Sequence, residues 1–260
     1  MGLERYLKAA KEAAQTAGRF LRESMDTARE IVFKGSVDLV TNLDNQSQDM
    51  IFKYLSASFP DHDFLAEEGL SEKRGAEFRW IIDPLDGTTN YTHKFPVFTV
   101  SIALEREREI VLGVVFDPMR EEMFTALKGG GAFLNERKVR VSSVDDLDKS
   151  LVATGFPYDI RVSEVNNINH FNNFATRVQA IRRCGSAAMD LCYVACGRFD
   201  GFWELKLQPW DMAAGTLIVE EAAGQISDFK GKVFSFDSAE ILASNGLIHG
   251  QMIDVLQLKK

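Results

Sequence analysis

Cysteine and histidine are scarce in this chain of 260 residues, which contains three cysteines and four histidines. Cys184, Cys192 and Cys196 are odd in number and form no CxxC pair, which argues against a disulfide framework and a structural zinc site. We expect them to pack as small apolar residues, with Cys192 and Cys196 on one helix face. The histidines lack an HExxH-like spacing. This cysteine usage fits a reducing compartment, and we expect a cytoplasmic protein.

The sequence also lacks a long hydrophobic run and an excess of basic charge. Its apolar stretches at residues 97–104 and 110–116 are too short to cross a bilayer. Residues 1–8 are charged from the start and have no apolar core, so we expect no signal peptide. With 30 Lys and Arg against 38 Asp and Glu, the net charge is −8. Direct nucleic-acid binding calls for a basic face, so this charge argues against it.

The residues that are present, 45% hydrophobic and 26% charged, are typical of a globular protein. This composition excludes a disordered tail, a collagen-like repeat and a disulfide mini-protein. The length suits one large domain or two closely joined subdomains, because single cores stop growing near ~250–300 residues.

Hydrophobic spacing predicts helices first and strands afterwards. Apolar residues recur at three- and four-residue steps over residues 3–21 and predict a helix, either packed on its own domain or forming a coiled-coil seam. A second helix is predicted over residues 44–59, ended by Pro60. Strands are then predicted at residues 64–66, 80–82, 97–104, 110–116, 123–127 and 131–134. The glycines at 129–131 lack the GK[ST] ending of a P-loop and predict a hairpin turn.

In the second half of the chain, predicted strands and helices alternate, which indicates a sheet covered by helices. The strands are predicted at residues 151–153, 179–182, 199–205, 225–227 and 241–243. The helices are predicted at residues 163–177, 186–195 and 211–223. We place a boundary in the polar stretch 142–149, which divides the chain into an N-terminal α+β subdomain, residues 1–145, and a C-terminal α/β subdomain, residues 146–260.

Two aspartates, Asp83 and Asp86, directly follow the predicted strand at residues 80–82. Pro84 lies between them and is expected to end the strand, because it has no backbone N–H and fixes its own backbone. If a short helix begins at once, the N–H groups of residues 87–89 would form an anion pocket. The alternative is a plain Asp-Gly turn.

Two further acidic groups stand at the expected ends of elements. Glu67 and Glu68 follow the strand at residues 64–66, although adjacent glutamates are also common on surfaces. Asp211 opens an apolar helix, where the alternative role is that of a capping residue. Each of these groups carries little weight alone.

Gathering Glu67, Asp83, Asp86 and Asp211 would be costly. Two carboxylates ~4 Å apart repel by about 4 kcal/mol at an effective dielectric constant of about 20. Divalent cations between them would offset this repulsion, and oxygen donors without His or Cys favour Mg²⁺ or Mn²⁺ over zinc. A pair of such cations suits the displacement of a phosphoryl group by water.

Residues Asp83–Asn90 and Pro209–Gly215 resemble the two signatures of the inositol monophosphatase family. The segment 34–44, the Glu67–Glu68 pair, Gly185–Ala187 and Glu204 also follow that family's order and spacing, so the resemblance covers nearly the whole chain. It implies a layered α-β-α-β-α sandwich of the inositol monophosphatase / fructose-1,6-bisphosphatase type, with the site between two subdomains. It also implies a lithium-sensitive, Mg²⁺-dependent phosphoric monoester hydrolase and suggests a homodimer.

The resemblance implies metal ligands at matching positions. Glu67, Asp83 and the backbone carbonyl of Leu85 would hold a first Mg²⁺. Asp83, Asp86 and Asp211 would hold a second, and Glu67 with waters would hold a weaker third, with Mn²⁺ as an alternative metal. Family members often have isoleucine at the Leu85 position, a change to which a carbonyl ligand is indifferent.

Catalytic and substrate-binding roles are implied in the same way. Asp44 and Thr88 would orient the attacking water, with Glu68 close behind them. The N–H groups of Gly87 and Thr88 would hold phosphate oxygens, and Asp211 would support the leaving alkoxide. The hydroxyls of the alcohol would meet Asp86, Gly185, Ser186, Ala187 and Glu204. Lys34 would lie on a mobile lid loop.

The substrate stays open between several small phosphate esters. Inositol 1-phosphate, attacked in line by a metal-activated water, is the first expectation, because Glu204 fits a polyol hydroxyl. Fructose 1,6-bisphosphate, as in dual-function relatives, is the alternative; histidinol phosphate and 3′-phosphoadenosine nucleotides follow, since no added aromatic pocket is expected. Arg182 and Arg183 would contact an extra phosphate or form a solvated or interface pair.

Two other roles differ from hydrolysis of a small ester. Some bacterial relatives act with the transcription machinery, a role in which a protein partner would escape the charge argument against RNA. A catalytically silent metal-binding homologue is disfavoured, because every expected ligand is present.

Overall fold

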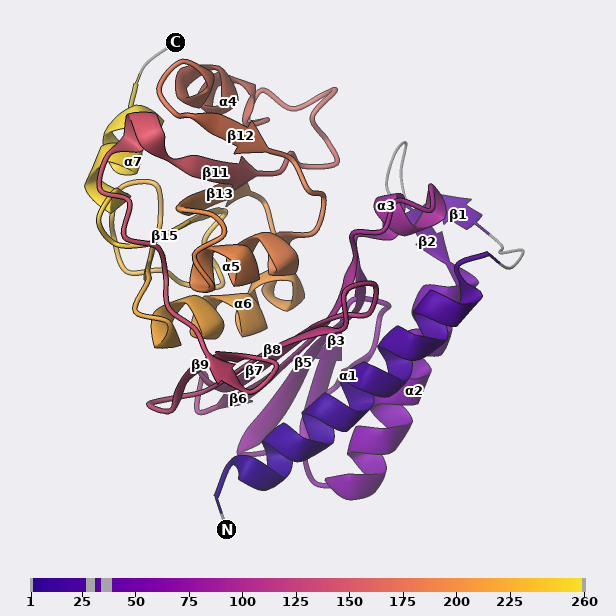
Figure 1. The fold of residues 1–260 in the computed structure, drawn as a ribbon. Helices are drawn as coiled ribbons and strands as arrows, with labels where there is room; N and C mark the ends of the chain where they lie inside the picture. The colour runs from indigo at the N-terminus through magenta and orange to yellow at the C-terminus, as the bar shows by residue number, and fades with distance from the viewer. Residues whose placement is uncertain (1, 27–30, 34–38, 259–260) are drawn as a thin grey trace.

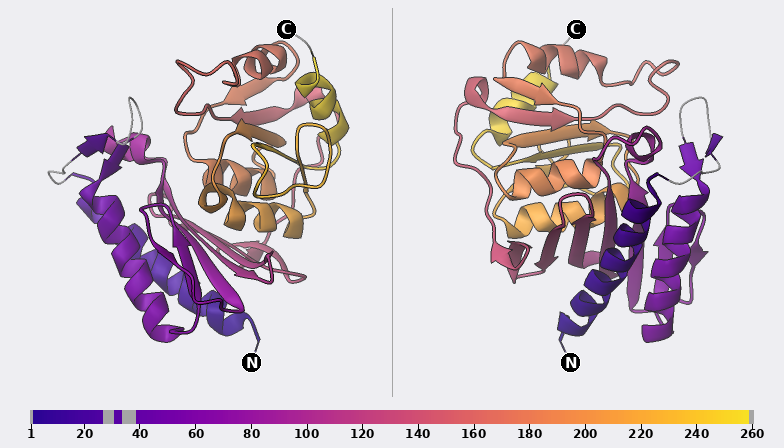
Figure 2. Two further views of the ribbon diagram at one scale, coloured as in Figure 1. Left: turned by 180° about the vertical axis from the view of Figure 1, so that it is seen from behind. Right: turned by 45° about the vertical axis from the view of Figure 1, so that its right-hand side comes forward.

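The computed structural model describes residues 2–26, 31–33 and 39–258 of the chain (Figure 1). Lys34, the predicted lid residue, lies outside the described residues. Helices and sheets alternate in layers, α-β-α-β-α, which confirms the predicted architecture (Figure 2). Within the described ranges, every helix is too short or too polar to cross a membrane.

The first half of the chain forms an eight-stranded sheet with two helices on its outer face (Figure 1). The helices are α1 (Glu4–Ser24) and α2 (Asn42–Ser58). The strands are β3 (Asp63–Ala66), β4 (Ser71–Glu72), β5 (Phe78–Asp86), β6 (Thr99–Arg106), β7 (Glu109–Asp117), β8 (Glu122–Leu127), β9 (Gly131–Leu134) and β10 (Arg137–Lys138). Their order across the sheet is β10-β9-β8-β7-β6-β5-β3-β4. The short elements β1 (Ile31–Phe33), β2 (Leu39–Thr41) and α3 (Thr88–Thr92) lie near one end of this sheet.

The second half forms a five-stranded sheet with helices on both faces (Figure 2). Its strands are β11 (Leu151–Thr154), β12 (Ala180–Arg182), β13 (Gly201–Leu205), β14 (Gln225–Ser227) and β15 (Glu240–Ser244), in the order β12-β11-β13-β15-β14. The outer helices are α4 (Ile168–Ala175) and α7 (His249–Leu256), and the turn η1 (Leu147–Lys149) precedes β11. The inner helices, α5 (Ala187–Ala195) and α6 (Pro209–Glu221), lie between the two sheets.

Helix α1 packs on its own sheet, which decides against the coiled-coil alternative. Its residues Ala10, Ala14 and Ala17 are fully buried and allow the helix backbone to approach β6 and β7. At Gly18, an added Cβ would stand 2.6 Å from the ring of Phe116. Small side chains on one helix face thus bring α1 flat against the sheet.

The middle of helix α6 is buried on all sides because it packs between the first sheet and α5. Residues 212–219 of α6 are all buried. At Gly113 of β7 an added Cβ would stand 2.7 Å from the Ala214 carbonyl oxygen, so the sheet and α6 are in close contact. A helix that is hydrophobic all round is expected in this position. The layer brings the N-terminal ends of α5 and α6 to the same side of the molecule.

Strand β5 does not end at Pro84, contrary to the prediction. It continues to Asp86, with Asp83 opposite Ser101 and Asp86 opposite Thr99 on β6. The register therefore places two residues of β5 opposite one of β6, which is a β-bulge. Proline is tolerated there because a bulge leaves a residue outside the hydrogen-bond ladder.

The second half differs from the prediction in two helices. The helix expected over residues 163–177 is the shorter α4, because Asn167 has a left-handed backbone, φ 73°. The buried Asn167 side chain also donates to the Gly155 carbonyl at 2.6 Å and accepts from Trp203 Nε1 at 2.9 Å, which holds this turn in place. Helix α7 was not predicted. The subdomain division at residue 145 stays a prediction.

Candidate active site

A cavity of about 580 Å³ lies where the first sheet, the central helices and the second sheet meet. Its walls come from the end of β5, from α3, from the first turns of α5 and α6, and from the segments that follow β11, β12 and β13. Many predicted site residues line it: Glu67, Asp83, Leu85, Asp86, Gly87, Thr88, Gly185, Ser186, Ala187, Glu204 and Asp211. The predicted residues Asp44 and Glu68 are not part of this wall.

Asp83 and Asp86 are held in place by groups on two different elements. Asp83 Oδ1 accepts a hydrogen bond from the Leu85 N–H at 3.0 Å, within the bulge of β5. Asp86 Oδ2 accepts from Ser186 Oγ at 2.7 Å and from the Ala188 N–H at 2.8 Å, both at the start of α5. Asp86 therefore joins the first sheet to the central helices.

Asp211 has the capping role given as the alternative and also lines the cavity. It occupies the third position of α6, and its Oδ2 accepts the Gln208 N–H at 2.7 Å in a capping box. Pro209 stands at the start of the helix, where its missing N–H costs nothing. The first turn of α6 thus holds the Asp211 carboxylate at the cavity.

Burial raises the pKa values of Asp83, Asp86 and Asp211, and repulsion from neighbouring carboxylates raises those of Asp83 and Asp211 further. Burial raises the pKa of Asp83 well above its ordinary value, and the negative charges of Glu67, Asp86 and Asp211 raise it further. Burial raises the pKa of Asp86 to about 6, although the hydrogen bonds from Ser186 and the α5 backbone lower it. The pKa of Asp211 is also raised, mainly by burial and then by the negative charge of Asp86. The groups therefore lie close enough to oppose one another's ionisation.

The donor chemistry of this group fits a hard divalent cation. All four side chains offer oxygen, and a cation between them would offset the repulsion that raises the pKa values of Asp83 and Asp211. Across the described part of the chain, however, no three His, Cys, Asp or Glu side chains are already arranged to hold an ion. The carboxylates of Glu67, Asp83, Asp86 and Asp211 are thus gathered around the cavity without converging on one point.

A buried pair of a hydroxyl and a carboxyl group, Thr88 and Asp44, lies beside this group. Thr88 Oγ1 is 3.0 Å from Asp44 Oδ1 and 3.1 Å from the Leu85 carbonyl oxygen. Asp44 is fully buried at the start of α2. Gln48, one turn later, accepts the Glu68 N–H at 3.0 Å and donates to the Glu68 carbonyl at 3.3 Å, which fixes the backbone beside Glu67. The sequence does not identify Gln48, because a polar residue on a predicted helix is expected to face solvent and nothing near it in the chain indicates a partner.

Two glycine turns contact each other at the cavity. Gly87 and Gly185 have φ values of 101° and 85°, and a Cβ on Gly87 would stand 3.2 Å from the Gly185 carbonyl oxygen. Asn90 connects the same segments, because its Nδ2 donates to Val97 O and Cys184 O, each at 2.8 Å. Asn90 stands within the first signature, but its role as a bridge depends on a partner far along the chain.

Replacing Gly185 by alanine is expected to reduce both stability and activity. A Cβ there would stand 2.9 Å from Asn90 Nδ2, and the left-handed backbone adds a strain of about 1–2 kcal/mol. The bridge to Asn90 must then shift, so we expect kcat/KM to fall by about tenfold or more. Urea unfolding and steady-state kinetics would measure the two effects.

Gly246→Ala is the matched control for Gly185→Ala. Gly246 also has a left-handed backbone, φ 84°, but an added Cβ meets nothing within 4 Å. The control therefore carries the strain without the collision. If both variants lost equal stability and kept full activity, close packing at Gly185 would have no consequence.

Some cavity residues were missed by sequence analysis. Asp190 of α5 is 1% exposed, and its Oδ1 has no hydrogen-bond partner in the part of the chain that the structure describes. Burial raises its pKa well above the ordinary value. Phe156, Tyr158 and Trp210 also line the cavity. That no added aromatic pocket for an adenosine group is present stays a prediction. These aromatics come from the loop after β11 and from α6, which the linear sequence does not bring together.

Comparison with known proteins places these features in context. The model of the inositol monophosphatase family matches residues 2–259. The inositol-1-monophosphatase of Mesorhizobium japonicum is 41% identical over 249 residues, 95% of this chain and 94% of that protein. The Nus factor SuhB of Escherichia coli K12 is 43% identical over 242 residues, 92% of this chain and 91% of that protein. A solved structure, the extragenic suppressor protein suhB of Bartonella henselae, has a TM-score of 0.93 at 39% identity, covering 98% of this chain and 100% of that one.

Proposed function

This chain belongs to the inositol monophosphatase family and is a phosphatase of small phosphate esters, and from that premise we propose that it hydrolyses inositol 1-phosphate to inositol and phosphate. The choice of a polyol as the alcohol part of the substrate rests on the position and burial of Glu204. Its carboxyl group lines the cavity, is 8% exposed, and makes no hydrogen bond to any described residue. Burial raises its pKa to about 8, so near neutral pH it can both donate to and accept from a hydroxyl group.

The family generally depends on a metal, and we assign the ligands to the acidic side of the cavity. Glu67, Asp83, Asp86, Asp211 and the Leu85 carbonyl would hold two or three Mg²⁺ ions, with Mn²⁺ as an alternative. Bound there, such ions lower the pKa of a water molecule and offset negative charge on phosphate oxygens. The pocket of carboxylates would otherwise repel a phosphate ester.

Thr88 and Asp44 would orient the attacking water. The Thr88 hydroxyl can donate its one proton to Asp44 Oδ1, 3.0 Å away, which leaves its oxygen free to accept a hydrogen bond. A water molecule that donates to Thr88 Oγ1 would then keep a lone pair for phosphorus, and its proton could pass through Thr88 to Asp44. Glu68 stands one residue after the ligand Glu67 and would support this arrangement.

The remaining residues would hold the two ends of the ester. The N–H groups of Gly87 and Thr88 precede and begin α3, where backbone donors have no partner within the helix, and would bind phosphate oxygens. The leaving oxygen would lie beside Asp211. The hydroxyls of the alcohol would contact Asp86, Ser186, Glu204 and the Gly185–Ala187 backbone.

Phosphate release from a panel of substrates at varied Mg²⁺ tests the proposal. We expect inositol 1-phosphate to give a higher kcat/KM than fructose 1,6-bisphosphate, histidinol phosphate or 3′-phosphoadenosine nucleotides. Glu204→Gln is expected to lower kcat/KM for inositol 1-phosphate by about tenfold, the scale of one to two hydrogen bonds. Turnover of p-nitrophenyl phosphate, which has no hydroxyl for Glu204, should change much less. Equal losses on both substrates would contradict the assignment of Glu204.

A second role is supported by the names of two relatives. The proteins of Escherichia coli and Vibrio cholerae that are 43% and 42% identical to this chain are named Nus factor SuhB. We propose contact with the transcription machinery as an additional role for this chain. An Asp211→Asn variant that lacks phosphatase activity but restores growth of a null strain would support it, and dependence of growth on phosphatase activity would oppose it.

A further inference from the structure

We infer that Gly155 is a positioning residue for Glu204: the space left by its missing side chain holds the Glu204 carboxyl group in the orientation that selects a polyol substrate. The inference rests on the proposed function, which assigns Glu204 to the hydroxyls of the alcohol. Gly155 has no side chain to offer to a substrate, so it would act through Glu204.

Strand register places Gly155 beside Glu204. Strands β11 and β13 are parallel neighbours, with Thr154 opposite Trp203. The next residues along the chain are Gly155 and Glu204, and both line the cavity. Residues that are opposite each other in adjacent strands project their side chains from the same face of the sheet. A side chain on Gly155 would therefore compete with Glu204 for one place.

The space beside Gly155 is occupied by the carboxyl group of Glu204. An added Cβ at Gly155 would overlap both carboxyl oxygens of Glu204 and the carbon between them. Gly155 does not have the left-handed backbone of Gly87 and Gly185, so glycine is needed here for space and not for an unusual φ. Glu204 is buried and makes no hydrogen bond to any described residue, so its carboxyl group is oriented by packing.

A buried hydrogen-bond network fixes the backbone of Gly155. The Asn167 side chain donates to the Gly155 carbonyl at 2.6 Å and to Thr154 Oγ1 at 2.8 Å. Thr154 Oγ1 donates in turn to the Trp203 carbonyl at 2.6 Å, and Trp203 Nε1 donates to Asn167 Oδ1 at 2.9 Å. All three side chains are buried. The network therefore joins the residue before Gly155 to the residue before Glu204.

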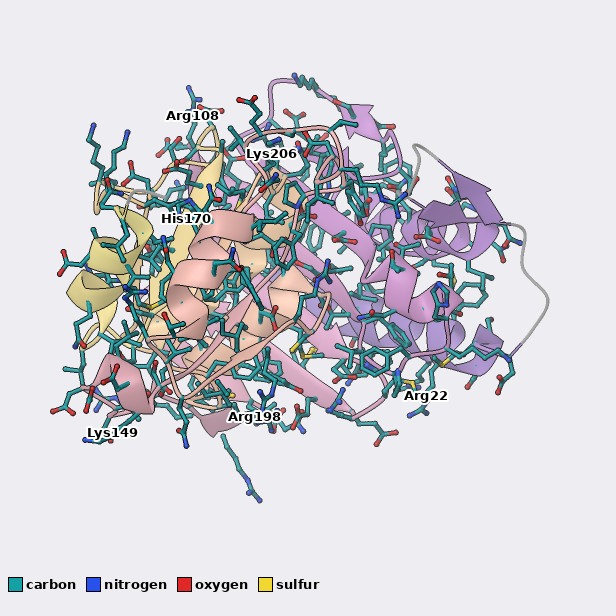
Figure 3. The ribbon with its side chains drawn as sticks, turned by 90° about the horizontal axis from the view of Figure 1, so that it is seen from above. Arg22, Arg108, Lys149, His170, Arg198 and Lys206 are labelled. Carbon is teal, nitrogen blue, oxygen red and sulfur yellow. The ribbon has the colours of Figure 1, made fainter. Side chains whose placement is uncertain are left out.

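Lys206, labelled in Figure 3, provides a second connection between the segments that carry Gly155 and Glu204. Its Nζ donates to Asp159 Oδ2 at 2.6 Å and to Ser163 Oγ at 2.8 Å, which lie after β11, whereas Lys206 directly follows β13. These bonds oppose a movement of the backbone. We therefore expect an alanine at position 155 to displace the end of the flexible Glu204 side chain and to leave the two segments in place.

A double-mutant cycle tests the inference. The variants are Gly155→Ala, Glu204→Ala and the two together, measured with inositol 1-phosphate and p-nitrophenyl phosphate. For inositol 1-phosphate, Gly155→Ala should lower kcat/KM about tenfold, mainly through KM, because a displaced carboxyl group loses its hydrogen bonds to the alcohol. The fall for p-nitrophenyl phosphate should be much smaller. The double variant should be no less active than Glu204→Ala, whereas two independent effects would multiply to about a hundredfold.

Gly201→Ala is the matched control. Gly201 begins β13, at the opposite end from Glu204, and an added Cβ there would overlap Met252 Sδ. A flexible side chain must shift in this variant too, but neither Gly201 nor Met252 lines the cavity. The control should keep both kcat/KM values. Unfolding curves would verify that each variant is folded.

Three results would overturn the inference: an unchanged kcat/KM for inositol 1-phosphate in Gly155→Ala, an equal fall with p-nitrophenyl phosphate, or multiplied losses in the double variant. If the wild-type protein does not hydrolyse inositol 1-phosphate, the proposed function fails, and the cycle is measured with the phosphate ester that loses most turnover in Glu204→Ala. A double variant no less active than Glu204→Ala would then support the role of Gly155 alone. If Glu204→Ala changes the turnover of no ester, Gly155 positions nothing and the inference fails.

Discussion

Replacing Asp211 by asparagine is expected to lower kcat by about a hundredfold to a thousandfold while the protein stays folded. The carboxylate lines the same cavity as Asp86, and an amide would neither bind a cation strongly nor support a leaving alkoxide. The capping hydrogen bond of α6 is retained in this variant, because an amide oxygen can still accept the Gln208 N–H. Loss of turnover would then come from chemistry alone.

Stability provides the second readout for Asp211→Asn. Burial and the charges of Asp86 and Glu67 raise the pKa of Asp211, so removing its charge relieves repulsion. We expect the free energy of unfolding at neutral pH in the absence of divalent ions to stay equal or to rise. Asp228→Asn is the matched control, because Asp228 also accepts backbone N–H bonds, from Lys230 and Lys232 at 2.8 Å, but does not line the cavity.

The control variant separates a capping effect from a catalytic one. Asp228→Asn should keep wild-type kcat. If Asp211→Asn retained a tenth of the wild-type rate or more, Asp211 would not be part of the catalytic group.

Chelation of divalent ions is expected to abolish phosphatase activity, and added Mg²⁺ should restore it. Without cations, the carboxylates of Glu67, Asp83, Asp86 and Asp211 would repel a phosphate ester, so activity should vanish and not merely decline. A cation that binds only the folded protein also stabilises it, by about 2.7 kcal/mol at a hundred times its Kd. Mg²⁺ should therefore raise the Tm by several degrees, which differential scanning fluorimetry measures independently of turnover.

Asp83→Asn tests whether the stabilisation comes from this site. Asparagine can still accept the Leu85 N–H that Asp83 Oδ1 accepts at 3.0 Å, so the bulge of β5 is retained. The Mg²⁺-dependent rise in Tm should shrink sharply in this variant. KCl at equal ionic strength is the control for screening. A rise of equal size with KCl, or in Asp83→Asn, would show that Mg²⁺ acts elsewhere.

Much of the architecture follows from local patterns in the chain. The alanine spacing of α1, the glycines between β8 and β9, and the strand–helix alternation after residue 150 all predicted elements that the structure contains. These features are local because helix and strand periodicity is set by the immediate backbone geometry. The failure at α4 has a distant cause: Asn167 shortens the helix through a buried hydrogen-bond network that depends on Trp203.

The two signatures identified the acidic side of the cavity for a chemical reason. Carboxylates at the ends of apolar elements are unusual enough to be recognised without knowing their neighbours. Residues such as Gln48, Asn90 and Asp190 were missed, because each is an ordinary polar residue until its distant partner is known. Gln48 holds the Glu68 backbone, and Asn90 holds Cys184, across gaps in sequence that no pattern bridges.

The residue types, the helical and strand periods and the acidic motifs were thus readable from the chain, since they depend on neighbours a few positions apart. Three features of the site are determined only by tertiary packing and strand register. Asp83 and Asp86, three positions apart, would face opposite sides of a regular strand, and the extra residue in the bulge of β5 reverses this. The contact between the turns of Gly87 and Gly185, and the choice of Arg183 over Arg182 at the cavity, arise only where distant segments meet, because side-chain direction there is set by the surrounding elements.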